Sequence, residues 1–268
     1  MNSTTAPATS TPWDAAIFGS VTALGALVTV LCLIRARRSP TVANRSIVVA
    51  FAICTIGVFF AVPSIAQATE SATGIDNIAK LIAHICAILW CAALQVTMVD
   101  IAYDPSYLRT AIYQRATVAI VFLTAMVPLW LSANATPGME FTTAHAGDVK
   151  VRIYLLLYLT YVFITCSELT FMCFRMAFLN WPGRPWSSVG YGASTLSAVF
   201  GVAYAISKGS YLIAYTIGSP WDLRTEEKIS PLLSGISVAF LFIGLTLPVF
   251  GWLLSKARTK PVPQAADA

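Results

Sequence analysis

Four ionisable side chains stand inside otherwise apolar stretches of this sequence: His84, Asp100, Glu168 and Lys208. A charged group in apolar surroundings is costly, so each is a candidate for ligand binding or proton transfer. Asp100 lies near the end of its stretch, and we expect its carboxylate to reach water there. The other three are the starting point for a candidate site.

Three of the apolar stretches carry polar and aromatic residues at helical spacing, so that these residues share one face of each helix. The face holds Lys80, His84, Cys91 and Gln95 in the first stretch. It holds Tyr154, Tyr158, Tyr161, Thr165, Glu168 and Met172 in the second, and Ser197, Gly201, Tyr204, Lys208, Tyr211 and Tyr215 in the third. Such faces are costly against lipid, which predicts that the three helices turn them toward one another.

The candidate intramembrane site therefore consists of Lys208, Glu168, His84, Gln95, Tyr158, Tyr161, Tyr204 and Tyr211. Three interpretations stay open. Lys208 and Glu168 could form a buried pair that fixes the helix register. Alternatively, Lys208 could hold an anionic or zwitterionic ligand in a water-accessible pocket above Glu168. The third interpretation is a proton relay.

The elements that must position these residues are membrane helices. The chain has 268 residues, of which 57% are hydrophobic and only 11% charged, and its mean hydropathy is +0.73. Soluble domains carry about 25% charged residues, so this composition excludes a soluble protein. Stretches of about 20 apolar residues can cross a bilayer. Seven occur, at about 14–34, 46–67, 78–101, 115–134, 152–176, 188–217 and 230–254. We expect an all-α, polytopic bundle of seven transmembrane helices.

The distribution of basic residues predicts the orientation of this bundle. One set of connections holds eleven of them: Arg35, Arg37, Arg38, Arg45, Arg109, Arg115, Arg175, Arg184, Lys256, Arg258 and Lys260. The opposite set holds five: Lys80, Lys150, Arg152, Arg224 and Lys228. The richer side is predicted to be cytoplasmic, in the plasma membrane. Residues 1–13 then form an extracellular segment, 14–254 the transmembrane domain and 255–268 a short basic cytoplasmic tail.

Several functional classes are excluded or disfavoured. The last stretch, Ile229–Ser255, has no lysine for a retinal Schiff base, and the ends of spans three and seven lack the DRY-like and NPxxY-like patterns of G-protein-coupled receptors. Hydrolase and nucleotide-binding signatures are also absent, so we expect no catalytic residues. The six cysteines lie in apolar stretches without a CxxC pair, which predicts small apolar side chains rather than disulfides or a metal site. No cofactor or nucleic-acid partner is expected.

Short stretches in spans two to seven resemble a family of actinobacterial seven-span membrane proteins of unknown function. They are Gly74–His84 with Gln95, Tyr154–Tyr161, Arg184–Trp186, Ser207–Gly209 and Gly244–Pro248. Members are usually described as transporters, and their genes often accompany helix-turn-helix regulators and zinc-peptidase-like proteins. They typically continue into a cytosolic helical domain. This sequence ends at Ala268, so we expect that domain to be absent.

Two functions follow as predictions. The first is a transporter of a small polar or anionic solute. The alternative is a membrane sensor or scaffold that signals through a cytosolic regulatory protein. The lipid bilayer is the one partner that the composition itself requires. The sequence does not indicate the oligomeric state.

Overall fold

The computed structural model describes residues 12–134, 141–181, 183 and 185–258. Within them the chain forms eight α-helices and one short 3₁₀ helix, with no strand. The helices are α1 (Pro12–Arg38), α2 (Val42–Ala61), α3 (Pro63–Thr73), α4 (Ile78–Ala102), α5 (Pro105–Asn134), η1 (Thr143–His145), α6 (Val149–Asn180), α7 (Pro185–Thr216) and α8 (Leu223–Arg258).

Seven of the described helices, all except α3, are long and apolar enough to cross a membrane. Their outer surfaces expose large apolar side chains such as Phe171, Phe174 and Phe178 of α6. The predicted all-α bundle of seven membrane helices is therefore confirmed, and the chain is an integral membrane protein. Its orientation stays a prediction. The predicted terminal segments, 1–13 and 255–268, lie almost entirely outside the residues whose side chains are described.

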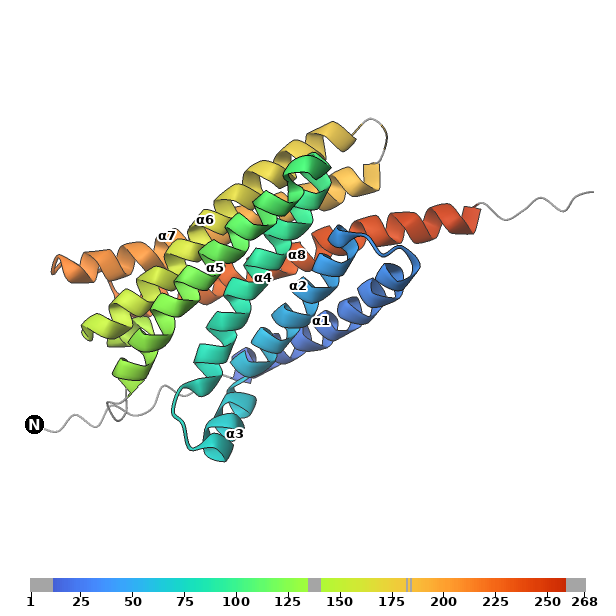
Figure 1. Ribbon diagram of the computed structural model, residues 1–268. Helices are drawn as coiled ribbons and strands as arrows, with labels where there is room; N and C mark the ends of the chain where they lie inside the picture. The colour runs from blue at the N-terminus through green and yellow to red at the C-terminus, as the bar shows by residue number, and fades with distance from the viewer. Residues whose placement is uncertain (1–11, 135–140, 182, 184, 259–268) are drawn as a thin grey trace, which may run out of the picture.

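The second predicted span, 46–67, is divided in the structure. α2 ends at Ala61, and α3 begins at Pro63 after an extended Val62. Proline has no N–H to continue a helix and disfavours helical geometry in the residue before it, so the chain turns there. Gly74, in the left-handed conformation at φ +66°, ends α3. α3 buries none of its residues and lies at one end of the bundle (Figure 1).

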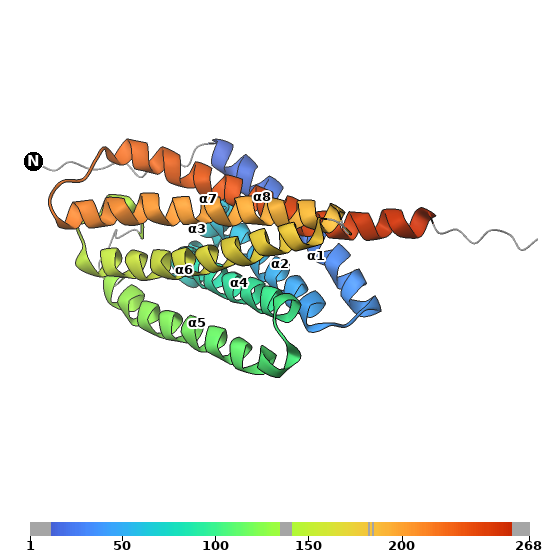
Figure 2. The same cartoon turned by 90° about the horizontal axis from the view of Figure 1, so that it is seen from above.

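Six helices form a ring, and α5 lies outside it. In sequence order, α1 packs against α2, α2 against α4, α4 against α6, α6 against α7, and α7 against α8. The ring closes where α8 meets α1 and where Phe242 of α8 stacks on Phe51 of α2, with ring centroids 5.4 Å apart. α5 packs on the outer side of α4 and α6 (Figure 2). The ring therefore surrounds a common interior.

Polar side chains fix several helix ends. Thr41 Oγ1 accepts a hydrogen bond from the Asn44 N–H at the start of α2, and Asp148 Oδ1 accepts from two N–H groups at the start of α6. Asp100 of α4 also belongs to this group, because its Oδ2 accepts a 2.7 Å hydrogen bond from the Ala43 N–H. The expectation that Asp100 only reaches water was therefore incomplete. Its carboxylate satisfies an otherwise unpaired donor in the first turn of α2.

Candidate functional site

Four of the predicted site residues, His84, Tyr158, Tyr204 and Lys208, lie in the half of the bundle where α4 and α6 begin. His84 of α4 stacks on Tyr158 of α6 with ring centroids 4.4 Å apart, and its Nδ1 is 2.8 Å from the hydroxyl oxygen of Tyr154. Lys208 of α7 lies with its Nζ 5.9 Å from the ring centroid of Tyr204. The predicted polar faces of α4, α6 and α7 thus meet in this half of the bundle, where they contribute aromatic rings and the imidazole of His84.

Glu168 has a different partner from the one proposed. Its carboxylate forms an ion pair with Arg115 of α5, and its Oε2 accepts a 2.5 Å hydrogen bond from Gln95 Nε2 of α4. Arg115 also donates to the Ala111 carbonyl oxygen at 3.1 Å and lies over the ring of Tyr103. The hypothesis of a Lys208–Glu168 pair is therefore wrong. A charge network does cross three helices, but it joins α4 and α6 to the outer helix α5.

The sequence analysis assigned Arg115 to a connection and not to the candidate site. The reason is that the fourth span was expected to begin at residue 115, whereas α5 begins at Pro105. The missed signal is Asp104-Pro105. Proline favours the first position of a helix, and Asp104 Oδ1 accepts a hydrogen bond from the Ser106 N–H at 2.9 Å. An earlier helix start would have placed Arg115 within the helix, about three turns after its first residue.

Tyr161 and Tyr211 belong to the packed core. Tyr161 packs against Phe122 of α5 with ring centroids 5.3 Å apart, so it points away from the centre of the ring. Tyr211 meets Trp221 edge to face at 5.4 Å. Both side chains are buried. Neither lines the cavity described next.

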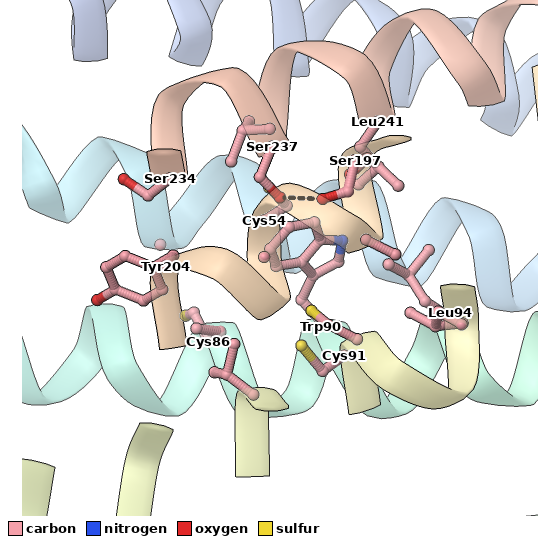
Figure 3. Close-up of a pocket in the computed structure, with 18 of the residues that line it drawn as sticks. Cys54, Cys86, Trp90, Cys91, Leu94, Ser197, Tyr204, Ser234, Ser237 and Leu241 are labelled. Atoms are coloured by element: carbon pink, nitrogen blue, oxygen red, sulfur yellow. Dashed lines mark hydrogen bonds between the residues drawn. The ribbon is translucent and has the colours of Figure 1, made fainter. Parts of the chain in front are cut away.

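A cavity of about 350 Å³ occupies the interior of the six-helix ring. Every helix of the ring contributes to its wall, and Trp90 of α4 projects into it toward α7 and α8 (Figure 3). Of the predicted site residues, His84, Tyr158 and Tyr204 line this central cavity, whereas Lys208, Glu168, Gln95, Tyr161 and Tyr211 do not. Its size falls within the range of small-molecule sites, ~300–1,000 Å³.

The wall of the central cavity is largely apolar. No Asp, Glu, Lys or Arg among the described residues lines it. Its polar groups are hydroxyls and thiols, together with His84 and the indole of Trp90. Ser237 Oγ donates to the Ser197 carbonyl oxygen at 2.8 Å (Figure 3). The buried Trp90 Nε1–H has no hydrogen-bond partner among the described residues, and a buried donor of this kind calls for a bound acceptor.

A second cavity of about 100 Å³ continues toward the end of the bundle that holds Arg35 and Asn44. The two cavities share five residues: Thr97, Met98, Tyr191, Ser194 and Leu245. Together they follow α4 from Ala83 to Ile101, which is about 27 Å at 1.5 Å per residue. That length is close to the ~30 Å of a bilayer core.

One buried carboxylate lies elsewhere. Glu226, near the start of α8, is 1% exposed. Its two oxygens accept 2.5 Å hydrogen bonds from the hydroxyls of Thr143 and Ser230. The sequence analysis did not identify Glu226 as a candidate residue. These hydrogen bonds attach η1, in the connection between α5 and α6, to the start of α8, which explains why Glu226 is buried there.

In the part of the chain that the structure describes, no three or more His, Cys, Asp or Glu side chains are grouped to hold a metal ion. All six cysteines are free. Comparison with protein-family models, with curated proteins and with solved structures gives no match. The resemblance to the actinobacterial seven-span family therefore stays a prediction, and functional inference depends on the geometry of the site.

Proposed function

We propose that this integral membrane protein is a transporter whose substrate passes through the central cavity. The observation that carries this proposal is the cavity of about 350 Å³ inside the six-helix ring, together with its continuation into the second cavity. A void that follows α4 through most of the bilayer depth suits passage better than it suits a purely structural core, because protein interiors are otherwise close-packed.

The scarcity of charged side chains in the wall of the central cavity limits which substrates could bind there. Lys208 does not line the cavity, and the charge of Glu168 is already balanced by Arg115. An anionic solute would therefore leave its own charge unpaired in the central cavity, which is costly at low dielectric. The geometry favours a substrate that sheds its water and carries no net charge in the bound state. We place the protein in the plasma membrane, with the Arg35 end in the cytoplasm.

Thiol accessibility tests this proposal, because Cys91 lies in the cavity wall. The variant that keeps Cys91 and replaces the other five cysteines with alanine is reconstituted in oriented proteoliposomes. A permanently charged methanethiosulfonate reagent is then added on one side at a time. The matched control is a cysteine-free chain carrying Ile206→Cys, since the side chain of Ile206 on α7 is 53% exposed on the apolar outer surface.

Transport predicts that Cys91 reacts from both sides while Ile206→Cys stays unmodified. Reaction from one side only would contradict transport and would support the alternative function, a membrane sensor with a ligand site. Absence of reaction from either side would show a closed void and would contradict both functions.

A further inference from the structure

The cysteines of this protein share one location. Five of them, Cys54, Cys86, Cys91, Cys166 and Cys173, line the central cavity, and the sixth, Cys32, lines the second cavity. Figure 3 labels Cys54, Cys86 and Cys91 among the residues that line this cavity with Trp90. Five thiols on one internal wall give that wall sulfur ligands in addition to its apolar surface. This distribution was not visible in the sequence, where the six residues are dispersed over four helices.

The sulfur atoms on two of these helices are spaced regularly. On α4, Cys91 and Met98 are seven residues apart and both line the cavity, and on α6 the same holds for Cys166 and Cys173. Seven residues return a helix to nearly the same face, after a rise of about 10 Å. Each helix therefore presents two sulfurs to the cavity, one above the other.

The two helices run side by side in a register that brings these sulfurs together. Cys173 Sγ lies 3.9 Å from Met98 Sδ, although the two residues are 75 positions apart in the sequence. The same offset of 75 residues sets Cys166 level with Cys91 on the neighbouring helix, and both residues line the central cavity. α4 and α6 thus carry two sulfur pairs along the cavity wall: the Cys91–Cys166 pair and the Met98–Cys173 pair.

We propose that these sulfur pairs bind a soft monovalent metal ion of the Cu(I) type, and that this ion is the substrate of the central cavity. This inference rests on the proposed transport function and names its substrate class. Thiolate and thioether sulfur select Cu(I) among biological metals. Zinc requires three or four protein ligands, and the described residues offer no such group. A pair of sulfurs suits an ion that accepts two-coordinate ligation.

Charge balance supports the same ion. When a monovalent cation binds, one thiol of the pair loses its proton to water, and a metal–sulfur bond forms to the resulting thiolate. The other sulfur donates a lone pair without a change of charge. The bound complex is neutral, so it needs no carboxylate in the wall, and none of the described residues supplies one there. No electron is transferred in this step.

Silver(I) is the probe, because it is a soft monovalent ion that is stable in air. Purified protein in chloride-free buffer is titrated with silver nitrate by calorimetry, and protons released are measured in parallel. We expect tight binding, with an affinity that rises about tenfold per pH unit for each proton displaced. Absence of silver binding to the unmodified protein would overturn the proposal.

Substitutions at Met98 separate ligation from packing. If Met98 is a ligand, Met98→Cys keeps silver affinity while Met98→Leu weakens it about tenfold or more. If Met98 only fills space, leucine is the better replacement, since its volume is closer to that of methionine, and this order would overturn the proposal. Met126→Leu is the control, because Met126 is 1% exposed and does not line the cavity.

Cys173→Ser is the second variant and is expected to weaken silver binding to the same degree as Met98→Leu. Its melting temperature is recorded to verify folding.

The silver titration and the Cys91 accessibility test together separate this inference from the transport proposal. If Cys91 is accessible from both sides but silver does not bind, the transport path stands and the metal substrate is contradicted. If Cys91 is inaccessible from both sides, both are contradicted.

Discussion

At the scale of single residues, the charged side chains of Arg115 and Glu168 hold helices together and do not line the central cavity. Glu168 is 27% exposed and Arg115 14% exposed, and Gln95 completes the contact between α4, α5 and α6. Removing one partner of a partly buried pair leaves the other charge uncompensated, which costs more than the pair itself contributes. The network therefore holds the outer helix α5 against the ring.

We expect Arg115→Met to lower the stability of the protein in detergent by about 2 kcal/mol, because Glu168 then keeps a charge in surroundings of low dielectric. The double variant Arg115→Met with Glu168→Gln should recover most of this loss, since no charge is left unpaired. The measurement is the melting temperature of the single and double variants.

Lys208→Met serves as the control for that cycle. Glu168 pairs with Arg115 and not with Lys208, and the Nζ of Lys208 lies over the face of Tyr204. We expect its melting temperature to stay within the range of the unmodified protein. If Lys208→Met were as costly as Arg115→Met, and Glu168→Gln relieved that cost, the assignment of the Glu168 partner would be wrong.

At the scale of elements, the contact between α7 and α8 depends on the absence of side chains. Gly244 of α8 faces Ser194 and Gly190 of α7 so closely that a Cβ at position 244 would lie 2.7 Å from the Gly190 carbonyl oxygen and 2.7 Å from the Ser194 nitrogen. Small residues allow membrane helices to approach in this way. The same contact borders the second cavity.

Gly244→Ala is therefore expected to lower the stability by about 1–3 kcal/mol, as other overpacking substitutions do. Two of the three colliding atoms belong to the backbone of α7, so one helix must move. Gly235→Ala on the same helix is the matched control, because nothing lies within 4 Å of a Cβ there. Alanine also favours the helix over glycine, so this control should be neutral or slightly stabilising. Equal melting temperatures for the two variants would contradict the close contact.

At the scale of the whole molecule, the bundle has two unlike ends. One end of the bundle carries a cluster of basic residues, Arg35, Arg37 and Arg38, in the last turn of α1. The opposite end contains most of the acidic residues that lie outside the helices. The cytoplasmic surface of a membrane protein carries the excess of lysine and arginine. We therefore expect Ser39 to face the cytoplasm and Ser219, in the connection between α7 and α8, to lie outside the cell.

Labelling of single cysteines tests this orientation. In a cysteine-free chain, Ser219→Cys should react with a membrane-impermeant maleimide in intact cells, whereas Ser39→Cys should react only after permeabilisation. Both serines are exposed, so intrinsic access does not differ between them. The reverse labelling pattern would mean that the charge asymmetry does not set the orientation of this protein.

The sequence by itself determined the seven membrane helices, because runs of apolar residues long enough to cross a bilayer have few other stable structures in so apolar a chain. It also identified the α4, α6 and α7 faces that bring His84, Tyr158 and Tyr204 to the cavity wall. Helical periodicity was sufficient for this, since it describes the face of each single helix.

Only the tertiary structure decided which residues pair across helices. Periodicity does not specify the start of a helix or its shift and rotation relative to its neighbours, so Arg115 rather than Lys208 became the partner of Glu168. For the same reason the sequence did not reveal that Cys173 meets Met98, 75 residues away. The central cavity itself is a space left between six helices, and its position depends on how all of them pack together.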